Sequence, residues 1–118
     1  MWKKRPEKII TGCATDRGTV RDKNQARIVC LSGHIVQGTA AVGCVCDGIG
    51  SFAYSEIASE MVTEGVRLWF QSAADGRLGN LTEEELTEDL CATIRELNEL
   101  VWERGERERL DLGCTMSA

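Results

Sequence analysis

The sequence predicts an α+β fold in which several antiparallel strands carry one pair of helices. Short apolar runs typical of strands fill the first half of the chain, up to residue 47. Two longer segments with helical periodicity follow, at 54–73 and from 82 onward. A final segment, 111–118, begins a further strand. Because two helices cover only one face of a sheet, the other face needs another layer.

The composition is that of a globular domain: 42% of the 118 residues are hydrophobic and 28% are charged. At this length the chain is one domain or a piece of one. The net charge is -5 and the only basic cluster is 3–5, which argues against nucleic acid as the main partner. No apolar run approaches the ~20 residues of a membrane span, and no signal-peptide core is present. We therefore expect no membrane association and a cytoplasmic location.

Six cysteines are present, and the spacing of Cys44 and Cys46 places both on one face of a strand. Without a secretory signal, we interpret the thiols as reduced, buried groups that act as small hydrophobes. A zinc site would need paired C-x-x-C spacings, which the sequence lacks. The cysteine pattern therefore disfavours zinc.

The chain is organised around the stretch Cys44-Val45-Cys46-Asp47-Gly48-Ile49-Gly50. The apolar run 40–46 predicts a buried strand, and it ends abruptly in Asp47 and two nearby glycines. A carboxylate at the end of a buried strand is costly unless a cation or hydrogen-bond donors receive it. Glycine lets the backbone come close to whatever the carboxylate holds. A magnesium or manganese ion is the natural candidate, and a strand-end cap is the alternative.

Three strands are expected in the chain up to residue 46. Residues 9–15 favour a first strand, and a polar loop follows over 20–26. The segments 26–32 and 35–46 then predict an antiparallel hairpin with its turn near Gly33.

The first helix is predicted over 54–73, because its apolar residues recur at three- and four-residue steps. Its apolar face consists of Ile57, Met61, Val62, Val66, Trp69 and Phe70. The small residues Ala58 and Ser59 would allow this helix to approach a sheet closely.

The second helix has a strong start signal, since Thr82 and Glu85 have the spacing of a capping box. Its apolar stripe is Leu86, Leu90, Ile94, Leu97 and Val101. We expect this helix to fray within 103–109.

Three separated motifs recur in a known family. The first is 15–25, Thr-Asp-Arg-Gly-Thr-Val-Arg-Asp-Lys-Asn-Gln, and the second is 45–50, Val-Cys-Asp-Gly-Ile-Gly, followed by Glu-Ile-Ala-Ser at 56–59. The third is 113–118, Gly-Cys-Thr-Met-Ser-Ala. In this order and spacing they resemble the PPM-type (type 2C) metal-dependent protein serine/threonine phosphatases, in particular the bacterial branch. The resemblance spans nearly the whole chain, so that 1–118 is expected to be a single partial domain, the N-terminal half of the family's domain.

The resemblance implies a four-layer α-β-β-α sandwich, in which two antiparallel sheets face each other and a helix pair covers each outer face. This chain would supply several strands and one helix pair. The implied activity is hydrolysis of phosphoserine and phosphothreonine in proteins. In the family, two divalent cations, Mn²⁺ or Mg²⁺, activate a bridging water that attacks the phosphorus.

The resemblance also assigns roles to three residues. Asp47 aligns with the carboxylate that bridges both metal ions, and Gly48 aligns with the residue whose backbone carbonyl binds the second ion. Arg21 aligns with the arginine that binds the substrate phosphate, a role suited to its fork of donors. Taken without the family, Arg21 is a surface charge.

Two departures from the family pattern bear on activity. The first motif normally ends in an aspartate that serves the second metal, and this chain has Ala26 there. The two later aspartates that hold the first metal belong to the family's C-terminal half. The chain's own Asp75, Asp89 and Asp111 lie in other contexts.

Two hypotheses follow. In the first, the gene encodes a phosphatase, and these 118 residues are a truncated piece that is inactive until completed. Its partners are a phosphoserine or phosphothreonine protein and a cognate serine/threonine kinase. In the second, the chain is a degenerate pseudophosphatase that binds a phosphoprotein or another partner without turnover. Asp47, Gly48 and Arg21 favour the first, whereas Ala26 favours the second.

Overall fold

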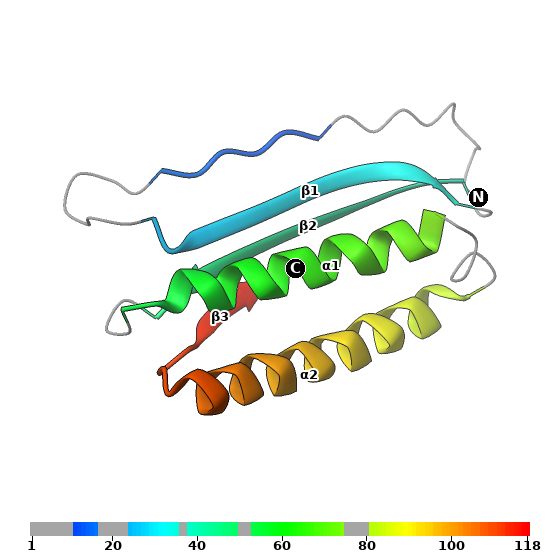
Figure 1. Ribbon diagram of the computed structural model, residues 1–118. Coiled ribbons are helices and arrows are strands. Elements are labelled where there is room, and N and C mark those ends of the chain that lie inside the picture. Colours follow the sequence, from blue (N-terminus) through cyan, green and yellow to red (C-terminus); the bar gives the residue numbers. More distant parts are fainter. Residues whose placement is uncertain (1–10, 17–23, 36–37, 50–52, 75–80) are drawn as a thin grey trace.

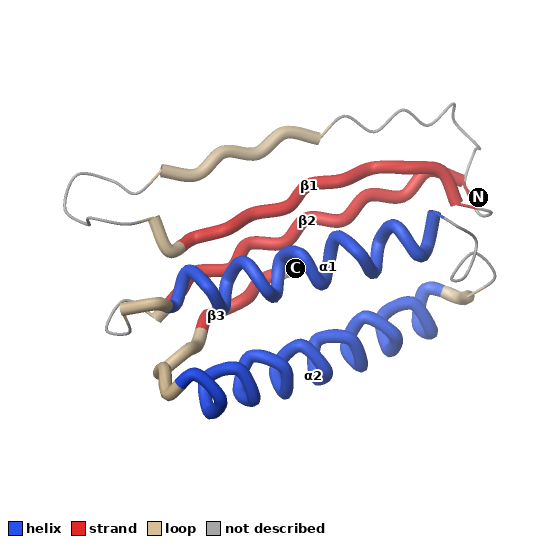
Figure 2. Tube along the Cα trace, viewed as in Figure 1, coloured by secondary structure: helices blue, strands red, loops and turns tan. Residues whose placement is uncertain are grey.

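The computed structural model describes residues 11–16, 24–35, 38–49, 53–74 and 81–118. Within these ranges the fold is α+β, with a three-stranded antiparallel sheet in the order β1-β2-β3 and two helices (Figures 1 and 2). The elements are β1 (Ala26–Ile35), β2 (Gly38–Gly48), α1 (Ser55–Ala74), α2 (Glu83–Glu108) and β3 (Cys114–Ser117). The α+β class is therefore confirmed.

Strands β1 and β2 form the expected antiparallel hairpin, with Ala26 opposite Asp47 and Ile35 opposite Gly38. The predicted turn near Gly33 is wrong, because Gly33 lies inside β1 and pairs with Ala40. A Cβ atom at Gly33 would lie 3.7 Å from the Phe70 ring. The glycine thus marks the place where a helix side chain packs on the strand, and the two strands run on to residues 35 and 38.

The strand expected at 9–15 is not formed where the structure describes it. Residues 11–16 have no ladder partner and are exposed, and 9–10 lie outside the described ranges. The segment nevertheless lies alongside β1 (Figure 1). Asn24 Nδ2 donates a 3.0 Å hydrogen bond to Thr15 Oγ1. Side-chain contacts of this kind, rather than backbone pairing, connect the segment to the sheet.

Helix α1 packs on one face of the sheet, as its periodicity predicts. Ala58 and Ser59 are fully buried, which confirms that small residues allow the close approach. The same face of β2 presents Cys44 and Cys46, at 2% and 0% exposure, whereas Val45 between them is 53% exposed. The two helices therefore lie on one face of the sheet (Figure 2), and the exposure of Val45 indicates that no described element covers the opposite face.

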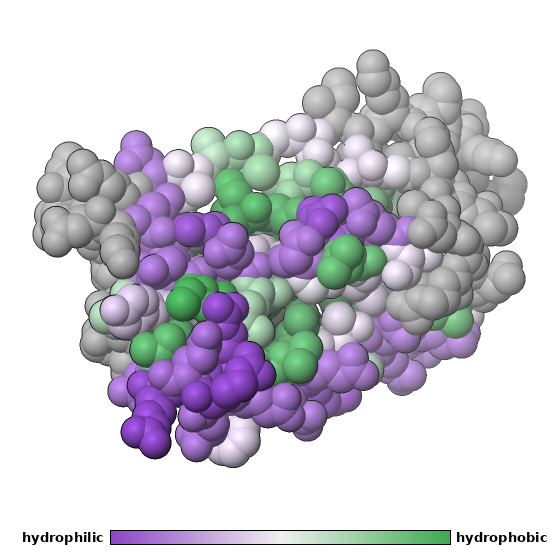
Figure 3. Space-filling view, in the orientation of Figure 1, coloured by the Kyte–Doolittle hydropathy of each residue, from purple (hydrophilic) through white to green (hydrophobic). Residues whose placement is uncertain are grey.

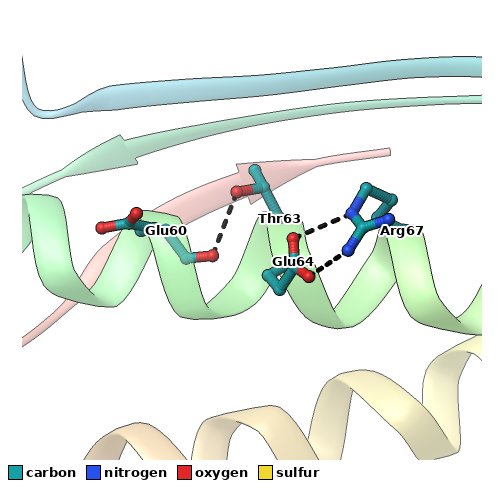
Figure 4. Close-up of polar contacts among 4 residues, drawn as sticks. All are labelled: Glu60, Thr63, Glu64 and Arg67. Atoms are coloured by element: carbon teal, nitrogen blue, oxygen red, sulfur yellow. Dashed lines mark hydrogen bonds and ion pairs between the residues drawn. The ribbon is translucent and has the colours of Figure 1, made fainter.

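Thr63, Glu64 and Arg67 make polar contacts within α1 itself (Figure 4). Thr63 is buried, and its hydroxyl donates to the backbone oxygens of Ser59 and Glu60 at 2.9 and 3.2 Å. On the solvent side, Arg67 and Glu64 form a two-bond ion pair. A hydroxyl that bonds to its own preceding turn can be buried without another partner.

Helix α2 begins with the predicted capping box. The Glu85 amide donates to Thr82 Oγ1 at 3.2 Å, and the Thr82 amide donates to Glu85 Oε1 at 3.3 Å. The predicted fraying is wrong, because the helix continues to Glu108 and ends on Arg109 in the left-handed conformation, φ 55°. An ion pair of 2.8 Å between Arg104 and Glu108 supports this last turn.

The two helices differ in what they pack against. The backbone of α1 comes close to all three strands, whereas the backbone of α2 comes close to α1 and to none of the described strands. The side chains of Leu97 and Val101 join α2 to the common core. Neither described helix has the length and apolar character needed to cross a membrane.

Candidate functional site

Asp47 lies at the carboxyl end of β2, and its side chain is exposed. Side chains alternate along a strand, and Cys44 and Cys46 point toward the helices. The Asp47 side chain consequently lies on the opposite, open face of the sheet, the face that also carries Val45. Because this carboxylate is exposed, it carries no burial cost, so the expectation that a cation must compensate a buried carboxylate at position 47 is wrong. The side chain is instead accessible from solvent on the open face.

The hydrogen bonds around Gly48 define which cross-strand pairs are closest. The Gly48 amide donates to the Gln25 carbonyl at 3.1 Å, so these two residues form a hydrogen-bonded pair. Such pairs alternate with non-hydrogen-bonded pairs, which have Cα atoms about 4.5 Å apart and side chains in close proximity. Ala26 and Asp47 form the next pair and are therefore of this closer kind. A side chain at position 26 is a direct neighbour of the Asp47 carboxylate.

Gly48 is a glycine for a packing reason that is independent of any metal. A Cβ atom there would lie 2.9 Å from Gln25 Cβ and 2.9 Å from both the carbonyl carbon and the Cβ of Ser55. Ser59 Oγ donates a 2.5 Å hydrogen bond to the Gln25 carbonyl. The end of β2, the entry to β1 and the start of α1 are thus held together around Gly48. Sequence reasoning did not assign Gln25, Ser55 or Ser59 to this site, although the small size of Ser59 had pointed to close packing.

Arg21 lies in 17–23, outside the described ranges, so the structure does not show its position. The residues on either side of that stretch are described. Thr15 and Asn24 share a hydrogen bond, and Asn24 Oδ1 accepts from the Ala26 amide at 3.0 Å. Both ends of the first motif are therefore fixed beside the strand end at which Ala26 and Asp47 pair.

The third motif reaches the same end of the sheet from the other side. Thr115 on β3 lies opposite Asp47. The Ile49 amide donates to the Gly113 carbonyl at 3.0 Å. The described parts of the three motifs are far apart in the sequence but meet at one end of the sheet. They are Asn24 and Gln25, then Asp47 and Gly48, then Gly113 and Thr115.

The oxygen atoms at this end of the sheet can form part of a divalent-cation site. Asp47 offers a carboxylate, and Gly48 can offer a backbone carbonyl, which suits Mg²⁺ or Mn²⁺. In the part of the chain that the structure describes, no group of three or more His, Cys, Asp or Glu side chains is placed to hold a metal ion. Position 26, where a second carboxylate would lie closest to Asp47, carries a methyl group. The described residues therefore supply a fraction of the ligands that two ions need.

Three thiols lie under the helices on the opposite face from Asp47. Cys44 and Cys46 have their sulfur atoms 3.6 Å apart. The pKa of Cys46 is raised by hydrogen bonding with the thiols of Cys114 and Cys44 and by burial. The pKa of Cys114 is lowered by its hydrogen bond with Cys46. Burial as small hydrophobic groups fits Cys44 and Cys46, whereas Cys13 and Cys91 are exposed, contrary to the expectation from sequence.

Comparison with known proteins leaves the family open. A scan against protein-family models finds no match, and searches of curated proteins and of solved structures find none either.

Proposed function

We propose that this chain is part of a PPM-type protein serine/threonine phosphatase. The observation that carries the proposal is that the three motifs meet at the same end of the sheet. The hydrogen bonds from Gly48 to Gln25 and from Ile49 to Gly113, together with the pairing of Thr115 with Asp47, bring them there. The β1–β2 hairpin and the pairing of β3 with β2 bring these segments together, and the motif residues that meet there are candidates for a shared site.

The open face of the sheet supports the four-layer sandwich that the proposal requires. The helix pair covers one face, and the other presents Asp47 together with Val45, which is 53% exposed. A half-exposed valine in mid-strand is suited to packing against a second layer. In the proposed sandwich, a second antiparallel sheet covers Val45, and Asp47 lies at the mouth between the two sheets.

The roles in the proposed site are divided among three residues. Asp47 and Gly48 hold one side of a pair of Mn²⁺ or Mg²⁺ ions, and Arg21 binds the substrate phosphate. When bound, the ions supply an activated water for hydrolysis of phosphoserine or phosphothreonine. Since the described residues carry few of the ligands, we propose that these 118 residues alone do not turn over substrate. The remaining ligands would come from a C-terminal half of the domain.

The alternative function is a pseudophosphatase that binds a phosphoprotein or another partner without hydrolysis. One observation favours it: Ala26 is the direct cross-strand neighbour of Asp47, where the family pattern has a carboxylate. A methyl group cannot bind a cation, so the second ion would be weakly held. Under either function we propose a cytoplasmic protein without nucleic-acid or membrane partners. Under the phosphatase function, its partners are a phosphoserine or phosphothreonine protein and a cognate serine/threonine kinase.

Phosphate release by the product of the complete reading frame separates the two functions. We would assay it with a phosphothreonine peptide over a manganese series, beside the variants Asp47→Asn and Ala26→Asp. The phosphatase proposal predicts manganese-dependent release that Asp47→Asn abolishes and that Ala26→Asp supports at lower manganese. Peptide binding without release, unchanged in Ala26→Asp, would favour the binding module. If Asp47→Asn changes neither binding nor release, the site assignment is wrong.

A further inference from the structure

Cys13 in the segment 11–16 and Cys30 in β1 bring two thiols together at the surface of the molecule. Cys30 Sγ donates a 3.9 Å hydrogen bond to the carbonyl oxygen of Gly12, the residue before Cys13. The thiols of Cys30 and Cys13 also hydrogen-bond with each other. Both are free thiols, and Cys13 is exposed whereas Cys30 is partly exposed. The stretch 14–29 therefore separates two sulfur atoms in sequence that the fold holds in contact.

The segment that carries Cys13 has backbone freedom that a strand of the sheet lacks. Residues 11–16 make no ladder pairing and run alongside β1 (Figure 1), and Figure 3 shows them at the surface in the same view. A disulfide needs a sulfur–sulfur bond of about 2.05 Å and a narrow range of dihedral angles. Because side-chain contacts alone connect this segment to the sheet, its backbone can shift to meet that geometry without breaking a ladder hydrogen bond.

The other close pair of thiols lacks this freedom. Cys44 Sγ and Cys46 Sγ lie 3.6 Å apart, but both residues belong to β2, which pairs with β1 and with β3. They are 2% and 0% exposed. A bond between them would distort the middle strand of the described sheet, and an oxidant would have to enter the core. Contact, access and backbone freedom coincide at Cys13 and Cys30.

The two thiols of this pair are suited to different steps of an oxidation. Hydrogen bonding with Cys13 raises the pKa of Cys30, and desolvation contributes in the same direction, so that the Cys30 thiol stays protonated. Cys13 is the more exposed of the two. The thiolate is the form that attacks a peroxide, and access to solvent decides which thiol the peroxide reaches. Cys13 is therefore placed to react first, with Cys30 beside it.

We propose that Cys13 and Cys30 form a reversible disulfide when the protein meets hydrogen peroxide. The Cys13 thiolate attacks one peroxide oxygen and the O–O bond breaks, which leaves a sulfenic acid at Cys13 and a hydroxide ion that becomes water with the proton the thiol released. The Cys30 sulfur then attacks the Cys13 sulfur, the S–O bond breaks, and the hydroxyl leaves as water with the Cys30 proton. The two thiols lose two electrons, which reduce the peroxide. Glutathione reverses the step by thiol–disulfide exchange.

The disulfide would join the segment 11–16 to β1 by a covalent bond. In the reduced protein, a 3.0 Å hydrogen bond between the side chains of Asn24 and Thr15 helps to hold this segment. For a cytoplasmic protein, as proposed above, disulfides are usually transient and redox-sensing, which agrees with thiols that are reduced at rest. The inference does not depend on the phosphatase assignment, because it rests on the two thiols alone.

The test is oxidation of the 118-residue chain with an equimolar amount of hydrogen peroxide. The remaining thiols are then blocked with N-ethylmaleimide, and the tryptic digest is analysed by tandem mass spectrometry. We expect a monomer that has lost two hydrogen atoms and in which Cys13 is linked to Cys30. Cys91→Ser, which replaces an exposed thiol on α2, should give the same product. Cys13→Ser, at an exposed position, should keep its fold by circular dichroism and give no link to Cys30.

The order of the two steps is tested with Cys30→Ser, which lacks the second thiol. Oxidation of this variant should leave a sulfenic acid at Cys13 that dimedone traps, and its absence would overturn the assignment of Cys13 as the attacking thiol.

Titration against glutathione, with and without urea, measures what the fold contributes. A disulfide that stabilises the fold is stabilised by the fold to the same extent, so we expect the midpoint value of [GSH]²/[GSSG] to be about tenfold or more higher in the folded chain than in urea. Equal midpoints would overturn the proposal. So would a product dominated by links between chains, by links from Cys13 to another cysteine, or by a Cys44–Cys46 bond.

Discussion

Ala26 and Asp47 face each other across β1 and β2 as a close, non-hydrogen-bonded pair on the open face of the sheet. The first of these residues ends one motif and the second is the centre of another. Their pairing explains why the identity of residue 26 matters for a cation at Asp47. It also makes the effect of a second carboxylate predictable from sheet geometry alone.

The variant Ala26→Asp should be slightly less stable than the parent without metal and more responsive to metal. Like charges directly opposite each other in a sheet cost about 0.2–1 kcal/mol. A cation that binds between the two carboxylates offsets their repulsion. At a cation concentration ten times the dissociation constant, binding adds about 1.4 kcal/mol to the free energy of unfolding. Urea denaturation with and without Mn²⁺ measures both effects. Ala26→Asn is the control, and an equal manganese response in both variants would contradict the assignment.

Replacement of Gly48 by alanine should destabilise the fold even without metal. The new Cβ would lie 2.9 Å from backbone and Cβ atoms that cannot easily move, so we expect a loss of about 1–3 kcal/mol. Gly43→Ala, on the same strand with no atom within 4 Å of its Cβ, should be neutral or stabilising. Thermal denaturation of both variants checks the comparison. Equal melting temperatures would show that β1, β2 and α1 do not meet as closely at Gly48 as described.

The contact between the two helices can be tested at Gly65. A Cβ atom there would overlap the two Leu97 methyl carbons, so Gly65→Ala should destabilise the protein by about 1–3 kcal/mol. Shortening the opposing side chain should recover part of that loss. The double variant Gly65→Ala with Leu97→Val should therefore be more stable than additivity of the two single variants predicts. Strict additivity in urea denaturation would mean that these residues do not touch.

The exposed ion pair on α1 gives a pH-dependent prediction. Hydrogen bonding with Arg67 lowers the pKa of Glu64 below its ordinary value. A carboxyl group whose pKa is lowered by folding contributes stability above its unfolded pKa and loses it as the pH falls through the folded pKa. Because the pair is exposed, the effect on stability is small and screened by salt. NMR titration should find the Glu64 pKa below its ordinary range, and returning to that range in Arg67→Ala. Identical titration curves in the two proteins would contradict the ion pair.

The sequence predicted the parts of the fold that local pattern determines. Helix α1 follows from its apolar periodicity, and the start of α2 follows from Thr82 and Glu85, because the capping box needs only residues close in sequence. The antiparallel pairing of 26–32 with the following strand was also predictable from two apolar segments that a short glycine-containing stretch separates. These features need no knowledge of distant contacts.

The wrong predictions concern features that are determined by contacts between residues far apart in the sequence. The turn predicted near Gly33 is wrong because Gly33 pairs with Ala40 inside β1 and lies beside Phe70 of α1. The last turn of α2 is held by the Arg104–Glu108 pair and by close packing of Gly105 against the Leu110 carbonyl oxygen, which periodicity does not reveal. For the candidate site, the role of Asp47 and Gly48 as metal ligands stays a prediction. The direct pairing of Ala26 with Asp47 depends on register, which a single sequence does not specify.

The central claim, that the Asp47 carboxylate collects divalent cations on the open sheet face, is tested most directly by paramagnetic broadening of NMR signals with trace Mn²⁺. The account predicts that the amide signals of Ala26, Asp47 and Thr115 broaden first, and that Asp47→Asn removes this effect while leaving the chemical shifts of α2 unchanged. Broadening centred on the acidic first turn of α2, Glu83–Glu85, and identical in the Asp47→Asn variant, would contradict it.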